Sequence, residues 1–178
     1  FMDDAELIRG WTEGRDRSAL QELVRRHLRE MYDFAVRRLR NEHDAADAVQ
    51  QIFLQLVRRL SELREPEAFR VWLYRIAVNE TGQILRSRRS RRPLEDSVLP
   101  VATRRVPEDR ELQEQVLHAV GGLAEEHRVP VVLHYLQGLP FHEVGKVLGC
   151  PTSTASDRVH QGLDRLKRAL AGRIGEGE

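Results

Sequence analysis

The chain has 178 residues, a formal net charge of +1, 40% hydrophobic residues and 32% charged residues. It contains no run of about 18 consecutive apolar residues, so we expect no membrane insertion. Its single cysteine, Cys150, excludes an internal disulfide and a multi-thiolate metal site. The first residues lack the basic-then-apolar order of a signal peptide, and we expect a cytoplasmic protein.

The first 92 residues are predicted to form helices, because apolar residues recur there at spacings of three and four. One stripe runs from Ala19 to Leu39. A break follows it, where Asn41 and Asp44 are expected to supply breaker and N-cap chemistry. A second stripe covers residues 48–60. Pro66 interrupts the pattern, and a third helix is expected from about residue 67 into the arginine-rich residues 86–92.

Residues 93–110 are predicted to be a linker, because three of the seven prolines lie between positions 93 and 107 without an apolar period. A second helical block follows over residues 111–172, and no segment alternates like a strand. The acidic, glycine-rich residues 173–178 are expected to be a disordered tail. The sequence therefore predicts an all-α fold of two small helical domains, residues 1–92 and 111–172, joined by a Pro-containing linker.

The charge is divided unevenly between these halves. Residues 1–92 hold 19 Arg or Lys and 15 Asp or Glu, whereas residues 93–178 hold 10 and 13. All but two of the basic residues are arginine, whose guanidinium suits contacts to phosphate. Arginine-rich faces are also common on solvated surfaces, so charge alone leaves a nucleic-acid partner and an ordinary surface both open.

The end of the second block has the pattern of a helix-turn-helix. Residues 141–148 form a short amphipathic stripe, residues 149–151 break it, and a longer stripe runs over residues 155–170. Between them, the hydroxyls of residues 152–154 can cap the second helix. A short helix, a tight turn and a longer helix can place the second helix in the major groove. An ordinary helical hairpin has the same pattern, so the motif alone decides nothing.

Read together, the two halves resemble the bacterial group IV, or extracytoplasmic-function (ECF), sigma factors of RNA polymerase. In the first half the resemblance rests on residues 44–53 (DAADAVQQIF) and 66–79 (PEAFRVWLYRIAVN). In the second half it rests on Leu123, Arg128, Gly138, Glu143-Val144-Gly145, Leu148-Gly149 and Pro151 to Arg158. The order, the linker and the length also fit.

The resemblance implies a protein that binds core RNA polymerase, recognises the −10 and −35 promoter elements and promotes DNA melting, under control of an anti-sigma factor. It implies a polymerase-binding face at Asp44, Asp47, Gln50, Gln51 and Leu54. It implies −10 contacts from Ser61, Glu62, Arg64, Glu65, Arg70, Arg75, Asn79, Arg86, Arg88 and Arg89. It implies −35 contacts from Thr152, Ser153, Thr154, Ser156, Asp157, Arg158, His160, Gln161 and Arg165.

The second helix of the motif departs from the family pattern. Ser156 and Gln161 stand where the family commonly has basic residues, which lowers the number of phosphates this helix can neutralise. Asp157 could accept a hydrogen bond from cytosine N4 or could form a capping box with Thr154. The capping interpretation is favoured narrowly. Trp72 and Tyr74 could stack on bases, although Trp72 is expected in the core.

The sequence indicates no catalytic residues, no metal site and no cofactor. His142-Glu143 begins like a zinc-protease motif, but Lys146 stands where the second histidine is needed. One alternative function is a dimeric helix-turn-helix repressor that acts without polymerase. Another is a helical adaptor that works through protein contacts alone, which the arginines of residues 86–92 argue against.

Overall fold

The computed structural model describes residues 2–91 and 110–174, and within these residues it contains helices and turns but no strand. The predicted all-α fold is confirmed. No helix in these two ranges is long and apolar enough to cross a membrane. The predicted linker, up to residue 109, and the last four residues of the predicted tail lie outside the described residues.

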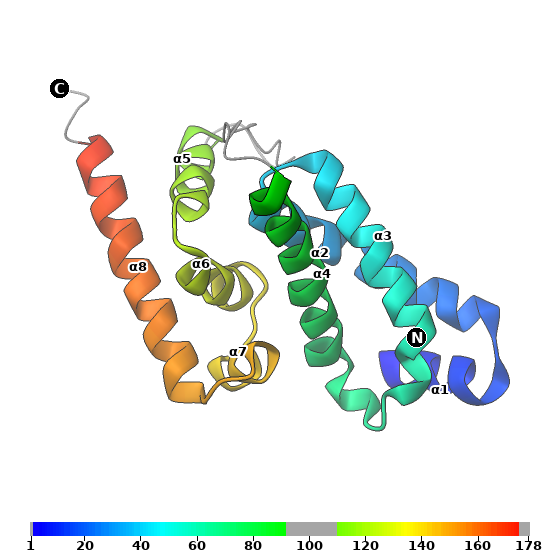
Figure 1. The fold of residues 1–178 in the computed structure, drawn as a ribbon. Helices are drawn as coiled ribbons and strands as arrows, with labels where there is room; N and C mark the ends of the chain where they lie inside the picture. Colours follow the sequence, from blue (N-terminus) through cyan, green and yellow to red (C-terminus); the bar gives the residue numbers. More distant parts are fainter. Residues whose placement is uncertain (1, 92–109, 175–178) are drawn as a thin grey trace. The chain divides into compact units, whose positions relative to one another are not determined.

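The described helices fall into two compact units. The first unit contains α1 (Asp4–Gly14), α2 (Arg17–Leu39) up to Ala35, α3 (Glu42–Arg59), the short 3-10 helices η1 (Leu60–Glu62) and η2 (Pro66–Ala68), and α4 (Phe69–Arg91) (Figure 1). The second unit contains residues 36–41 with α5 (Arg110–Gly121), α6 (Glu125–Val131), the π-helical turn η4 (Val132–Leu136), α7 (Phe141–Leu148) and α8 (Thr152–Ile174). The boundaries 1–92 and 111–172 stay predictions.

In the first unit, α3 packs along α4, and both contribute apolar stripes to one core. Ile52 and Leu56 of α3 are fully buried, as are Leu73 and Ala77 of α4. Phe34 of α2 is fully buried and meets the ring of Tyr74 edge-on at 5.6 Å. Burial of such side chains, each worth about 1.5–3 kcal/mol, is the main force that holds these helices together.

The helix α1 is an element that the apolar pattern did not predict. Its N-cap is Asp3, which accepts a hydrogen bond from the Glu6 amide at 2.8 Å, while the Glu6 carboxylate accepts one from the Asp3 amide at 2.8 Å. This reciprocal pair is a capping box. Leu7 and Ile8 are buried, and α1 packs against η1 and η2.

Carboxylates lie at the starts of α2 and α3, but Asp44 is not the N-cap that the sequence predicted for α3. Asp16 accepts hydrogen bonds from the amide of Ser18 at 2.8 Å and from its hydroxyl at 2.5 Å, beside the start of α2. The helix α3 begins at Glu42, so the expected N-cap role of Asp44 is wrong. Asp44 lies instead inside the first turn, where a carboxylate is favoured by the positive end of the helix dipole.

In the second unit, α5, α6 and α7 all pack on α8. Val144 of α7 and Ala155 and Val159 of α8 are fully buried between them. A Cβ added at Gly145 would lie 2.8 Å from the carbonyl oxygen of Cys150, so the small residue lets α7 approach the turn into α8.

Candidate nucleic-acid interface

The outward face of α3 carries the predicted polymerase contacts. Asp47, Gln50 and Gln51 are exposed, and Leu54 keeps 45% of its surface accessible. These residues follow one another at helical spacing, opposite the buried Ile52 and Leu56. An exposed leucine among amides and a carboxylate is suited to a protein partner. Asp44 is half-buried and lies at the edge of this face.

Residues 61–68 form an exposed loop between two buried anchors, Leu60 and Phe69. Inside the loop, the amide of Leu63 donates to the carbonyl of Leu60 at 3.2 Å, and the amide of Ala68 donates to that of Glu65 at 2.9 Å. The predicted −10 residues of the loop, Ser61, Glu62, Arg64 and Glu65, are all exposed. Glu62 is also paired with Arg59 at 3.1 Å.

An exposed polar row runs along one face of α4. Arg75, Asn79, Gln83 and Arg86 are exposed, and their spacings of four, four and three place them on one face of the helix. The row extends over about 16 Å at 1.5 Å per residue. Three of the four residues were predicted. Gln83 was missed, although its spacing from Asn79 was readable in the sequence.

Arg70 and Arg88 of α4 form contacts inside the unit, away from this row. Arg88 is half-buried and forms an ion pair with Asp44 of α3. Arg70 is paired with Glu30 of α2 at 3.1 Å, and its guanidinium lies 5.8 Å from the ring centre of Tyr74. Arg70 therefore also has a role inside the unit. The side chain of Arg89 lies outside the described residues.

The aromatic side chains of α4 differ from expectation in opposite directions: Tyr74 is more buried than expected, and Trp72, expected in the core, is only half-buried. Tyr74 is fully buried, and its hydroxyl donates to the Glu30 carboxylate at 2.7 Å. The idea that Tyr74 could stack on bases is therefore wrong, because its ring has no exposed face. Trp72 is half-buried and lies 6.2 Å from Phe69, ring centre to ring centre.

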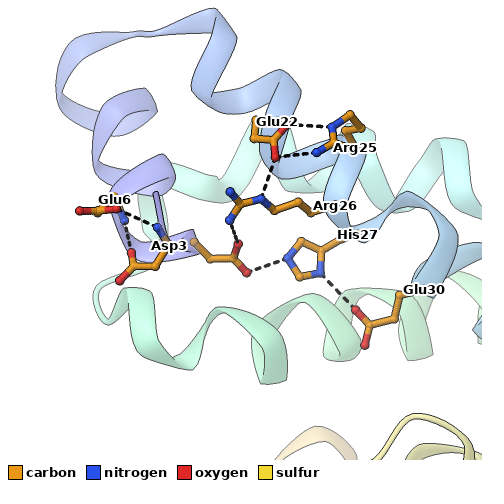
Figure 2. A network of polar contacts seen from close by, with 8 residues as sticks. Asp3, Glu6, Glu22, Arg25, Arg26, His27 and Glu30 are labelled. Atoms are coloured by element: carbon orange, nitrogen blue, oxygen red, sulfur yellow. Dashed lines mark hydrogen bonds and ion pairs between the residues drawn. The ribbon is translucent and has the colours of Figure 1, made fainter. Parts of the chain in front are cut away.

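A charged network joins α2 to α1 (Figure 2). The ring of His27 lies between the carboxylates of Asp4 at 2.7 Å and Glu30 at 3.2 Å. Burial of the ring lowers its pKa, but the hydrogen bonds to Glu30 and Asp4 outweigh this effect and raise the pKa. Burial raises the pKa of Glu30, yet hydrogen bonds from His27, Tyr74 and Arg70 lower it to about 2.

The first half of α8 presents most of the predicted −35 residues outward. Thr152, Ser153, Asp157, His160, Gln161 and Arg165 are exposed, while Thr154, Ser156 and Arg158 are half-buried. His160 is oriented by its Nδ1, which lies 2.8 Å from the carbonyl oxygen of Ser156. A carbonyl oxygen only accepts, so Nδ1 carries the proton of this bond.

The capping interpretation of Asp157 is wrong. The carbonyl of Pro151 accepts the first helical hydrogen bond, from the amide of Ala155 at 3.0 Å. Pro151 therefore takes the N-cap position, and Thr154 lies inside the first turn of α8 rather than before it. Asp157 stands one turn further along, exposed among the predicted −35 residues, where a capping box cannot form.

Two family profiles match the chain. Residues 23–92 match Sigma-70 region 2, and residues 119–168 match Sigma-70 region 4. The ECF RNA polymerase sigma factor SigM of Mycobacterium tuberculosis is 34% identical over 94% of this chain and 84% of its own length. The ECF RNA polymerase sigma factor SigE of Mycolicibacterium smegmatis is 35% identical over 84% of this chain, which spans only 61% of that relative.

A solved structure has the same fold. It is the sigma factor RpoE in complex with the anti-sigma factor NepR from Bartonella quintana, with a TM-score of 0.70 and 18% identity. The match covers 85% of this chain and 96% of that chain. At this identity the likeness concerns the arrangement of helices alone.

Proposed function

The chain belongs to the ECF group of RNA polymerase sigma factors. On this premise we propose which of its surfaces binds each partner in transcription initiation. The exposed face of α3 binds core RNA polymerase. The loop of residues 61–68 and the α4 row bind the −10 element as a single strand. The outward face of α8 binds the −35 element as a duplex.

The observation that carries the −10 assignment is that the exposed α4 row lies on the helix that begins where the loop ends. Single-stranded DNA is held by a cationic track together with groups that accommodate splayed bases. The exposed loop provides a site beside the start of α4, and Arg75 and Arg86 provide cationic groups along the same helix. Opening DNA costs a few kcal/mol for each unpaired base, which binding of the extruded strand can offset.

The −35 assignment rests on the exposed residues at the start of α8. The helix carries hydroxyls, His160 and Gln161, which can bond base edges in the major groove, whereas only Arg158 and Arg165 among the predicted residues can neutralise phosphate. We therefore expect the second unit alone to contribute little non-specific affinity for duplex DNA. Contact with polymerase would supply the rest.

An anti-sigma factor is the proposed regulator, in keeping with the partner named for the Bartonella quintana relative. Such a partner would compete for the α3 face, where Leu54 is exposed. The proposed role is one of binding and DNA opening and assigns no enzymatic reaction to the chain. Its proposed location is the cytoplasm, where core polymerase and promoter DNA meet.

Reconstitution with bacterial core RNA polymerase tests the proposal. The holoenzyme should initiate transcription on promoters selected from a randomised duplex library, and permanganate should detect unpaired thymines at the −10 element. Core enzyme alone is the control. Tight binding of the free chain to palindromic duplexes, without polymerase-dependent initiation, would favour the dimeric repressor instead.

A further inference from the structure

The loop of residues 61–68 is supported from beneath by the helix α1. The helix packs against both η1 and η2, the two 3-10 turns that shape the loop. Its own apolar contribution is small, since Leu7 and Ile8 are its two buried apolar residues within the described chain. A short helix with so little apolar surface needs other contacts to be held in place.

Those contacts come from α2 and meet the first turn of α1. The carboxylate of Asp4 accepts a hydrogen bond from His27 Nε2 at 2.7 Å and pairs with the guanidinium of Arg26 at 3.2 Å. Figure 2 shows Arg26, held by Glu22, beside His27 and Glu30 on the same helix. Because hydrogen bonds between charged groups are about twice as strong as neutral ones, Asp4 is a strong attachment point.

His27 also contacts the other end of the loop. Its ring meets Phe69, the buried anchor at the start of α4, edge-on at 5.2 Å. The same ring bonds Glu30, whose carboxylate holds Tyr74 and Arg70 of α4. One side chain therefore connects α1, which lies beneath the loop, with the helix that begins where the loop ends.

We propose that Asp4 and His27 are positioning residues for −10 recognition, which hold α1 against the loop of residues 61–68 and so fix the shape in which the loop receives a base. This inference rests on the proposed function for its consequence in DNA binding. Its structural part, that Asp4 and His27 order the loop, can be tested in the free chain.

The protonation of His27 sets the strength of the attachment. Both ring nitrogens face carboxylates, which accept only, so both must carry a proton and the ring must be charged. The charged groups around it are Asp4 of α1, Arg26 and Glu30 of α2, and Arg70 of α4, with the Tyr74 hydroxyl behind Glu30. The pKa of His27 is raised, so the contribution of its charge to the attachment is complete below its ordinary value of about 6.5 and is lost as pH rises through the folded-state pKa.

Amide hydrogen exchange of the free chain tests the structural part. The amides of Leu63 and Ala68 are protected by hydrogen bonds within the loop. D4N and H27Q should each speed their exchange about tenfold, whereas D4E, which keeps the charge, should not. The amide of Cys150, bonded in the second unit, serves as the internal control. Unchanged exchange at Leu63 and Ala68 in folded D4N and H27Q would overturn the proposal.

Binding of the holoenzyme to single-stranded DNA tests the functional part. The probe is a short non-template oligonucleotide of a selected promoter, compared with the same strand made abasic at one −10 position at a time. D4N and H27Q should lower the preference for the intact strand about tenfold, because a small displacement of binding groups is costly. Affinity for core polymerase and for −35 duplex should not change. A general loss of stability would lower all three affinities together.

Measuring the preference for the intact strand as a function of pH tests the proposal in the wild-type protein, without a destabilised variant. The wild-type preference should fall as pH rises above about 6.5, the ordinary pKa of histidine, and that of H27Q should stay flat. H142Q, which alters an exposed histidine of α7, is the matched control and should follow the wild type. Equal profiles for wild type and H27Q would overturn the proposal. If D4N speeds exchange at Leu63 and Ala68 but the wild-type chain forms no holoenzyme, the proposed function is contradicted and the structural part of this inference stands.

Discussion

Asp44, in the first turn of α3, forms an ion pair with Arg88, near the end of α4. The first residue was predicted to contact polymerase and the second to contact DNA. The pair therefore joins the two proposed binding surfaces within one unit. Its side chains are 25% and 39% exposed, so the pair is only partly shielded from water.

A double-mutant cycle measures what this pair contributes. We expect D44N and R88Q each to lower the free energy of unfolding by about 0.5–1 kcal/mol, the range for partly exposed pairs. The double variant should cost about as much as either single variant, because the interaction can be lost only once. Urea denaturation of the full chain gives the four values. Additive losses would show that the two residues act independently.

The salt dependence of strand binding distinguishes the arginines of α4. Each contact to a single-strand phosphate contributes about 0.7 to the slope of log affinity against log salt. R75Q should therefore lower the slope of the holoenzyme by about 0.7. R88Q should lower it less, since Asp44 already compensates that charge. R29Q, which removes an exposed arginine of α2, is the matched control.

The two faces of α3 should respond differently to shortening of a leucine. L54A removes an exposed side chain and should weaken core-polymerase binding about tenfold with little change in stability. L56A removes a fully buried side chain and should lower the free energy of unfolding by about 2–5 kcal/mol. Fluorescence anisotropy with labelled core enzyme and urea denaturation separate the two effects. Full polymerase affinity in L54A would remove this residue from the docking face.

Gly145 should tolerate no larger side chain. In G145A the new Cβ would meet the backbone carbonyl of Cys150 at 2.8 Å, and α7 or the turn must shift. We expect a loss of about 1–3 kcal/mol and weaker binding to −35 duplex. G14A adds the same methyl group where nothing lies within 4 Å, and it should leave both quantities unchanged. Thermal unfolding and duplex binding by holoenzyme are the measurements.

Acid titration should reveal the contribution of Glu30. Its folded-state pKa is about 2, below its ordinary 4.5, so its stabilising effect is complete above about pH 4.5 and is lost as pH falls through about 2. E30Q should cost roughly 3 kcal/mol at pH 7, and its difference from wild type should shrink as pH falls through that window. E13Q, at an exposed glutamate of α1, should differ little from wild type throughout.

Much of the fold was readable because the long helices carry uninterrupted apolar stripes. The buried residues of α3 and α8 follow their sequence periodicity closely. The helix α1 was missed because it buries only Leu7 and Ile8 among its apolar residues, although Asp3 and Glu6 form a capping box that the sequence displays. The role of Asp157 was misread because three successive hydroxyl residues precede it, and periodicity does not decide which residue begins a helix.

The contacts of the candidate site were less predictable than its location. Exposure of Asp47, Leu54 and Arg75 follows from the helical period once the buried stripe is known. The partners of Arg70 and Arg88 depend instead on how α4 lies against α2 and α3, which no local pattern specifies. The hydrogen bond between Asp4 and His27 likewise depends on how α1 packs against α2.

Leu60 and Phe69 are both buried in the core, and they anchor the two ends of the loop of residues 61–68. Ser61, Glu62, Arg64, Glu65 and Glu67 between them are exposed, so substitutions at these positions should cost little stability. On the proposed function, promoter preference at the −10 element is therefore expected to be separable from the scaffold that presents the loop. Grafting residues 61–68 from a relative should transfer that relative's preference, and divergence confined to this segment is a route by which duplicated factors acquire distinct target genes.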